Sequence, residues 1–210
     1  MSGLFVTFEG VDRSGKTTQA RMLAEALGEQ ALLVREPGGT ELGERLRELL
    51  KDERVAIDPP VEALLFAAAR GQLAAEVIRP ALAQGRVVVC DRFLDSSLAY
   101  QGAARGLGIE AVEAINDFAL EGLRPDLTFL LEIDPASAAQ RDGTSDRFEA
   151  AGSDFQQAVA AAYRALAERF PERYVRLDAT LPVTELHALV YARVRASLAA
   201  GTGSRREALA

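Results

Sequence analysis

The chain has 210 residues, of which 49% are hydrophobic, a formal net charge of −7 and one cysteine. This length suits one domain with a sizeable apolar core, and the acidic balance argues against a general nucleic-acid-binding protein, which would carry a basic face. A single cysteine excludes an internal disulfide, no signal peptide is recognisable in MSGLF, and no apolar run reaches about 18 residues. We therefore expect a cytoplasmic protein without a membrane span.

Short apolar, β-prone runs alternate with helical patterns along the whole chain. Strands are predicted at 4–8, 31–35, 86–91, 127–133 and 174–178. Helices are predicted at 16–27, 41–51, 58–85, 109–121, 153–170 and 182–199, with a further short one that starts at 134. The tail 200–210 is expected to be disordered. The alternation predicts an α/β fold in which a parallel sheet is flanked by helices in three layers, without repeats or linkers.

Local signals add detail to three of these segments. All four leucines of the helix 41–51 are expected to face inward. Asp58 is a plausible N-cap of the long helix that follows, and Pro80 is expected to kink it. The stretch 95–106, DSSLAYQGAARG, is polar and rich in small residues, and a helix is predicted only after it, from Ile109.

The first strand leads into a glycine-rich loop that carries a phosphate-binding pattern. The sequence GVDRSGKT fits G-x-x-x-x-G-K-[ST], whose glycines let backbone N–H groups point at phosphate oxygens. A chance glycine-rich turn is the alternative, but the strand before and the helix after the loop favour nucleotide binding. The lysine is expected to reach the β- and γ-phosphates, and the threonine hydroxyl to ligate magnesium. The residues expected to bind ATP here are Gly10, Val11, Asp12, Arg13, Ser14, Gly15, Lys16, Thr17 and Thr18.

A second group of polar residues follows the strand 86–91. Asp91 ends this strand, and ligands of open α/β sheets bind at that edge, so its carboxylate is a candidate for holding magnesium directly or through water. Arg92 could hold a second phosphate. The alternative is a strand-ending aspartate in a turn with a surface arginine. Glu9, just before the loop, is a further candidate as a metal or water ligand.

Several longer stretches resemble thymidylate kinases, the P-loop enzymes that phosphorylate dTMP to dTDP with ATP and magnesium. The resemblance covers nearly the whole chain and includes FEGVDRSGKTT (8–18), REPGGT (35–40), LFAAAR (65–70), VVCDRFLDSSLAYQ (88–101), AYQGAARGLG (99–108), RPDLTFLL (124–131), DRFE (146–149) and LDAT (177–180). It implies the P-loop NTPase fold with strand order 2-3-1-4-5, a cytoplasmic enzyme of dTTP biosynthesis and a homodimer. A cis bond between Glu36 and Pro37 is also expected.

The resemblance assigns an acceptor site for dTMP. It implies that Phe66 stacks on the thymine ring, although on sequence alone a phenylalanine there is more often a core residue. Tyr100 is implied to pack under the deoxyribose and disfavour a 2′-hydroxyl, and Asp12 to lie near the 3′-hydroxyl. Arg92 and Arg47 are implied to grip the phosphate. The remaining implied acceptor residues are Arg70 at the base, Ser97 and Gln101 near its edge, and Glu36 and Pro37 in the turn that shapes the pocket.

The donor side and the catalytic set follow in the same way. Arg141 is implied to face ATP from a lid at about 141–150, and Ala179 and Thr180 to border the adenine pocket. Arg13 lies inside the loop where many phosphate loops carry a small residue, and we expect it to act as an arginine finger in cis. The alternative is a solvent-facing arginine that this position merely tolerates. The catalytic residues are therefore predicted to be Arg13, Lys16, Asp91 and Arg92, and the magnesium ligands Thr17, Asp91 and Glu9.

Three other functions compete with this one. A kinase of the same fold could act on guanylate, cytidylate or a deoxynucleoside, but the run DRFLDSSLAYQ speaks against it. A P-loop switch or assembly protein would not need the pocket residues just named. A nucleic-acid-binding module would need a basic patch, which the sequence lacks.

Overall fold

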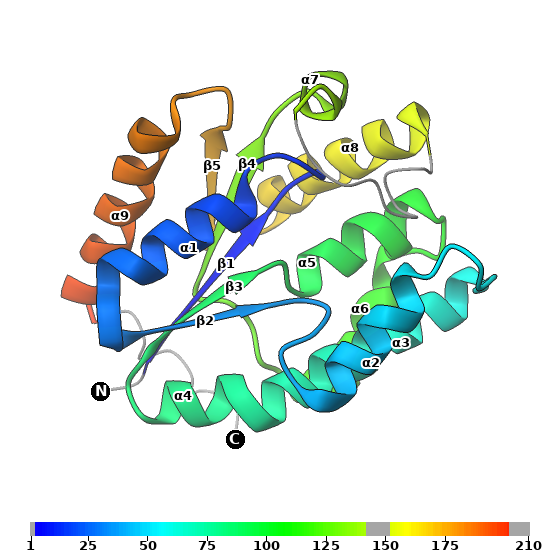
Figure 1. Cartoon of the computed structure of the whole chain (residues 1–210), viewed down its shortest axis with the longest axis horizontal. Helices are drawn as coiled ribbons and strands as arrows, with labels where there is room; N and C mark the ends of the chain where they lie inside the picture. The colour runs from blue at the N-terminus through cyan, green and yellow to red at the C-terminus, as the bar shows by residue number, and fades with distance from the viewer. Residues whose placement is uncertain (1–2, 142–151, 202–210) are drawn as a thin grey trace.

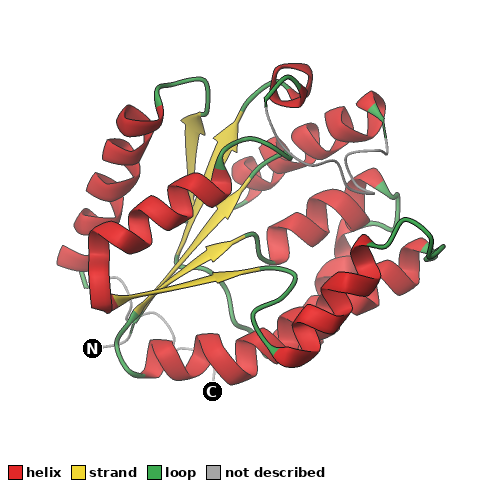
Figure 2. Ribbon diagram, in the orientation of Figure 1, coloured by secondary structure: helices red, strands yellow, loops and turns green. Residues whose placement is uncertain are grey.

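The computed structural model describes residues 3–141 and 152–201. Within them lies a five-stranded parallel sheet in the order β2-β3-β1-β4-β5, which confirms the expected fold (Figures 1 and 2). The strands are β1 (Leu4–Glu9), β2 (Ala31–Arg35), β3 (Val87–Asp91), β4 (Leu127–Glu132) and β5 (Tyr174–Asp178). Most of the predicted lid at about 141–150 and most of the predicted tail lie outside the described residues.

Helices cover both faces of this sheet (Figure 2). One core cluster joins the sheet to α1 (Lys16–Leu27) and α9 (Val183–Ala199). A second cluster on the opposite face draws on helices α3 to α8 and the wider-pitched helical segments η2 and η3. Their bounds are α3 (Pro59–Leu73), η2 (Ala74–Ile78), α4 (Arg79–Ala83), α5 (Leu94–Ser97), η3 (Leu98–Ala104), α6 (Ile109–Leu120), α7 (Pro135–Ala139) and α8 (Ser153–Arg169). A short 3-10 turn, η1 (Gly28–Gln30), links α1 to β2.

The central strands alternate between these two clusters, as a sheet covered on both faces requires. In β3, Val87 and Val89 belong to the cluster with α1 and α9, whereas Val88 and Cys90 belong to the other. β3 pairs with β1 so that Phe8 lies opposite Asp91. Because parallel strands end at the same edge, the loop after β1 and the polar residues after β3 come together there.

Helix α2 (Glu41–Lys51) corrects the prediction for its leucines. Only Leu50 is fully buried, while Leu42 and Leu49 are 45% and 39% exposed. The helix lies on the outside of α3 rather than on the sheet (Figure 1), so one narrow strip of its surface is covered. The prediction that all four leucines of α2 face inward was therefore wrong.

Two other segments also differ from expectation. Asp58 occupies the N-cap position of α3, but its side chain makes no capping hydrogen bond. The long helix expected at 58–85 is α3, η2 and α4 in succession, and the wide turn of η2 lies just before Pro80, which lacks an N–H to donate.

The stretch 95–106 is largely helical, as α5 and η3, because its polar side chains form hydrogen bonds inside the protein.

None of the helices described here has the length and apolar character needed to cross a bilayer. The peptide bond between Glu36 and Pro37 is cis, which confirms that prediction. It lies directly after β2, at the same edge of the sheet as the glycine-rich loop.

Candidate active site

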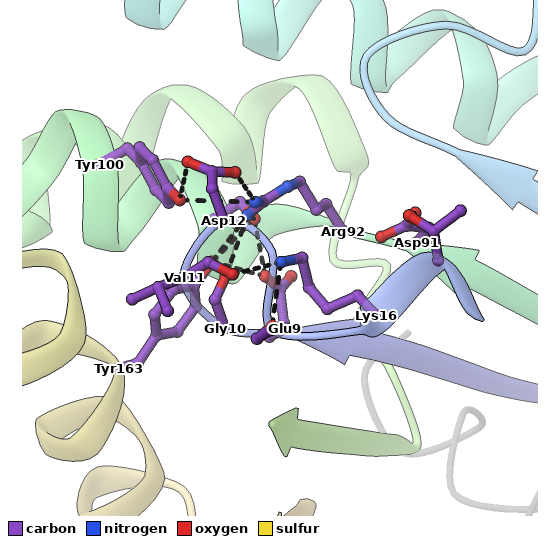
Figure 3. Close-up of polar contacts among 12 residues, drawn as sticks. Glu9, Gly10, Val11, Asp12, Lys16, Asp91, Arg92, Tyr100 and Tyr163 are labelled. Carbon is purple, nitrogen blue, oxygen red and sulfur yellow. Dashed lines mark hydrogen bonds and ion pairs between the residues drawn. The ribbon is translucent and has the colours of Figure 1, made fainter. Parts of the chain in front are cut away.

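The glycine-rich loop wraps around the buried side chain of Lys16 (Figure 3). The Lys16 Nζ donates to the Val11 carbonyl at 2.6 Å and to Ser14 Oγ at 3.2 Å. Gly10 and Gly15 have φ of 140° and 97°, and a Cβ on Gly10 would lie 2.6 Å from the Leu131 carbonyl. Burial, and then the nearby charge of Arg92, lower the pKa of Lys16 to about 8. The loop therefore holds the Lys16 side chain in a position to bind an anion.

Thr17 and Asp91 meet at the mouth of this loop. The Thr17 hydroxyl donates to Asp91 Oδ2 at 2.5 Å. A hydroxyl and a carboxylate are oxygen donors of the kind that Mg²⁺ prefers, and Mg²⁺ takes few protein ligands because it keeps waters and phosphate oxygens. Within 3–141 and 152–201, no cluster of three His, Cys, Asp or Glu side chains could hold a metal by itself.

Arg92, Asp12 and Tyr100 form a tight polar group beside the loop, which we call the arginine clamp (Figure 3). Arg92 Nη2 forms an ion pair with Asp12 Oδ1, and the Tyr100 hydroxyl donates to Asp12 Oδ2 at 2.9 Å. The Arg92 guanidinium also lies over the Tyr100 ring, 5.3 Å from its centroid. Burial alone would raise the pKa of Asp12, but Arg92 and Lys16 lower it below its usual value. Three residues predicted for the acceptor site are thus in contact.

Glu9 is fully buried beneath this clamp. Its Oε1 accepts from the Phe93 N–H at 2.7 Å, and its Oε2 accepts from Ser96 Oγ at 2.6 Å and the Tyr163 hydroxyl at 2.8 Å. Burial, and then the charge of Asp95, raise the pKa of Glu9 to about 7. Both oxygens are occupied by protein donors, so the contacts favour a structural role for Glu9, and its role as a metal ligand stays a prediction.

A cavity of about 380 Å³ opens beside the clamp. Its far wall holds a buried ion pair in which Arg70 Nε lies 2.7 Å from Glu36 Oε2. Arg70 also bonds Asn116 Oδ1 at 2.5 Å, and Arg47 Nη1 donates to the Pro37 carbonyl at 2.8 Å. The structure places every residue predicted for the acceptor site around this cavity: Asp12, Glu36, Pro37, Arg47, Phe66, Arg70, Arg92, Ser97, Tyr100 and Gln101.

A second cavity, of about 550 Å³, lies on the other side of the loop. The loop and the first turn of α1 form one wall, and Arg141, Ala179 and Leu181 form another. Arg141 Nη2 donates to the Ala179 carbonyl at 2.6 Å. Thr180 faces a neighbouring cavity, bounded by the ends of β4 and β5 and by α8. The structure therefore places Arg141 and Ala179 around the same cavity as the loop, whereas Thr180 lines the neighbouring cavity.

Arg13 lies between the two cavities and borders both. Its backbone is left-handed, with φ of 59°, and its Nη1 donates to the carbonyls of Ala139 and Arg141 at 3.0 and 3.2 Å. The side chain therefore joins the phosphate loop to the end of α7.

Sequence reasoning missed several side chains that build the site. Tyr163 of α8 and Ser96 of α5 contact Glu9, Asn116 of α6 contacts Arg70, and Glu62 of α3 accepts from Gln101 Nε2 at 2.8 Å. Tyr163, Asn116 and Glu62 lie in helical stretches outside any recognised motif, and only tertiary packing brings them to the site. Ser96 was within the run 88–101, which was a usable signal.

Comparisons with known proteins agree on one family. The family model described as thymidylate kinase matches residues 8–190. A thymidylate kinase of Pseudomonas fluorescens is 50% identical, with 89% of this chain and 92% of that protein covered. One from Deinococcus radiodurans is 48% identical, with 91% and 96% covered. The crystal structure of the thymidylate kinase from Ehrlichia chaffeensis has a TM-score of 0.77 and 33% identity, with 92% and 99% covered. The chain belongs to the thymidylate kinase family.

Proposed function

We propose that this chain transfers the γ-phosphoryl group of ATP to dTMP, giving dTDP and ADP. One observation carries the proposal beyond family membership. The two cavities are separate, yet Arg13, Lys16 and Thr17 border both. A phosphoryl group that passes between nucleotides bound in the two cavities would cross this shared wall, where the cations of the loop lie.

The larger share of the specificity is proposed for the acceptor cavity. Phe66 is partly buried on its wall and offers a ring face to thymine. Ser97 Oγ and Glu36 Oε1 are buried and have no hydrogen-bond partner within 3–141 and 152–201. A buried polar atom without a hydrogen-bond partner costs free energy, so a base that supplies the missing partners would bind more tightly. Gln101 and Arg70 complete the polar wall on this side.

The acceptor phosphate is proposed to bind Arg92, with Arg47 as a second contact. Tyr100 would face the deoxyribose and crowd a 2′-hydroxyl, and Asp12 would lie near the 3′-hydroxyl. The cis turn of Glu36 and Pro37 supports this wall, because the Pro37 carbonyl accepts from Arg47.

The donor cavity is proposed to hold ATP, with its phosphates on the loop 10–18 and its adenine toward Arg141 and Ala179. Thr17 and Asp91 would hold Mg²⁺, which would neutralise charge on the phosphates. Thr180 is proposed only as a border residue, since it lines the neighbouring cavity.

Catalysis then consists mainly of positioning and charge neutralisation. The acceptor is already an anionic phosphate, so it needs no strong general base. Lys16 and Arg92 would orient the two phosphate groups, and Arg13 would contact the group in transfer. We propose a lid at about 141–150 that excludes water from this reaction.

A coupled ADP-release assay across the common nucleoside monophosphates tests the proposal. We expect dTMP to be the best acceptor, dUMP to be used less well and ribonucleotides to be poor. Faster turnover of GMP or CMP than of dTMP would contradict it.

We also propose that the chain is one domain, works in the cytoplasm and forms a two-fold dimer through the helical segments 61–83, within α3, η2 and α4, and 109–120, which is α6. Phe118 of α6 is 90% exposed, and Val61 and Leu64 of α3 are 47% and 53% exposed. Exposed apolar side chains on neighbouring helices are typical of an isologous interface. Light scattering at micromolar concentration should give a dimer mass, and Phe118→Glu should give a monomer while the control Leu189→Glu on α9 does not. A monomer mass for the unchanged protein would contradict the dimer.

A further inference from the structure

The Arg92 backbone is held in an unusual conformation by groups on β1. Its φ is 69°, in the left-handed region that a residue with a side chain rarely adopts. The Arg92 N–H donates to the Phe8 carbonyl at 3.0 Å, and the next N–H, of Phe93, donates to Glu9 Oε1. The start of the Arg92 side chain is therefore fixed by two consecutive residues of β1.

The far end of the same side chain is held from both sides. Asp12 pairs with Nη2, while Nη1 donates to the Gly10 carbonyl and Ser96 Oγ at 3.2 Å each and to the Tyr163 hydroxyl at 3.4 Å. The Tyr163 and Ser96 hydroxyls lie 2.9 Å apart, and both reach Glu9 Oε2. With their protons directed at Glu9, both oxygens present lone pairs to Arg92.

Tyr163 comes from a part of the chain remote from the other members of this group. It lies on α8, and its side chain is 1% exposed, with its ring edge-on to Tyr100 at 6.4 Å between centroids (Figure 3). Gln156, two turns earlier on α8, hydrogen-bonds Asp12. One helix thus braces both partners of the Arg92–Asp12 ion pair.

We propose that Tyr163 is a positioning residue that, together with Ser96 and Glu9, fixes the Arg92 guanidinium for the phosphate of the acceptor nucleotide. The inference rests on the proposed role of Arg92. It predicts that the Tyr163 hydroxyl contributes to binding of the acceptor's phosphate and does not contribute to binding of its nucleoside. The reason is that the side of the cavity proposed for the base is built from other helices.

The test compares dTMP with thymidine, which lacks the phosphate, by titration calorimetry on the unchanged protein and Tyr163→Phe. This change removes one hydroxyl and keeps the ring. We expect dTMP to bind about two- to tenfold more weakly, the range for one lost hydrogen bond of ordinary strength, while thymidine affinity is unchanged. Ser96→Ala should act in the same direction. Tyr191→Phe on α9, outside both cavities, is the control and should change neither ligand.

A second arm separates positioning from packing. In an Arg92→Ala background, Tyr163→Phe should weaken dTMP no further, because the group that it positions is gone. An equal loss for dTMP and thymidine, or a full extra loss in the Arg92→Ala background, would overturn the proposal, as would unchanged dTMP affinity in both Tyr163→Phe and Ser96→Ala. If Arg92→Ala itself leaves the preference for dTMP over thymidine unchanged, the proposed role of Arg92 fails, and the role of Tyr163 falls with it.

Discussion

The two cavities that meet at the phosphate loop are built in different ways. The acceptor cavity is walled by side chains from the loop, α2, α3, α5 and η3, and many of its polar groups are paired with one another. The donor cavity is walled by the loop and the start of α1, with a few small or apolar side chains opposite. Within the described residues, Arg141 is the one arginine or lysine that lines the donor cavity from outside the loop. Its guanidinium donates hydrogen bonds to the backbone carbonyls of Arg13 and Ala179.

This difference matches what each side must recognise. Backbone N–H groups and a helix N-terminus suit any triphosphate, because every phosphate offers the same oxygens. Discrimination between bases and sugars needs side chains at fixed places, and unpaired buried groups penalise the wrong ligand. Substitutions on the shared wall should therefore impair turnover, and substitutions within one cavity should affect one substrate.

The shared wall should show the largest effect. Arg13→Gly keeps the left-handed backbone accessible and removes the guanidinium, so we expect kcat to fall by at least about 10²-fold, as for a lost arginine finger. The KM for dTMP should change much less, since the contact matters mainly in the transition state. Steady-state kinetics measure both values.

The exposed Arg21 of α1 supplies a matched control, and Arg21→Ala should leave kcat unchanged. The assignment is wrong if Arg13→Gly keeps near-normal kcat while Arg147→Ala, outside the described residues, loses it. In that case the lid would supply the finger.

A change confined to the acceptor cavity should affect one substrate. Phe66→Ala removes the ring proposed to stack on thymine, and we expect the KM for dTMP to rise about tenfold, within the range for a lost stacking contact. The KM for ATP should stay the same. Val183→Ala, on the donor cavity wall, is the mirror control and should leave dTMP unaffected. Equal rises for both substrates in Phe66→Ala would remove the distinction between the cavities.

The smallest expected effect is the uptake of protons by Lys16 when ATP binds. With the pKa of Lys16 lowered to about 8, this amine is about half deprotonated at pH 8 in the free protein. A bound phosphate favours the charged amine and raises its pKa, so ATP binding should take up about half a proton at pH 8 and almost none at pH 6.5. Calorimetry in buffers of different ionisation enthalpy measures this uptake. Uptake that does not depend on pH would show that Lys16 is already fully charged.

The sequence determined the features that depend on local order. Four of the predicted elements, 16–27, 31–35, 41–51 and 174–178, have the bounds seen in the structure, because the patterns of apolar strands and helices are encoded in neighbouring residues. The loop at Gly10 was recognisable because its glycines, lysine and threonine are needed at fixed spacing. The acceptor residues came from family resemblance, and the structure places them around one cavity, while their individual roles stay predictions.

Tertiary structure decided the rest. Whether Leu42 faces inward depends on what covers α2, and the partner there is one side of α3 rather than the sheet. The helical form of α5 and η3 depends on buried partners such as the Asp95–Arg173 ion pair, whose residues are far apart in the sequence. Likewise, Tyr163 reaches Glu9 only because α8 packs against η3 and against β4 and β5. No local pattern encodes such contacts, since they arise when distant segments are brought to the same edge of the sheet.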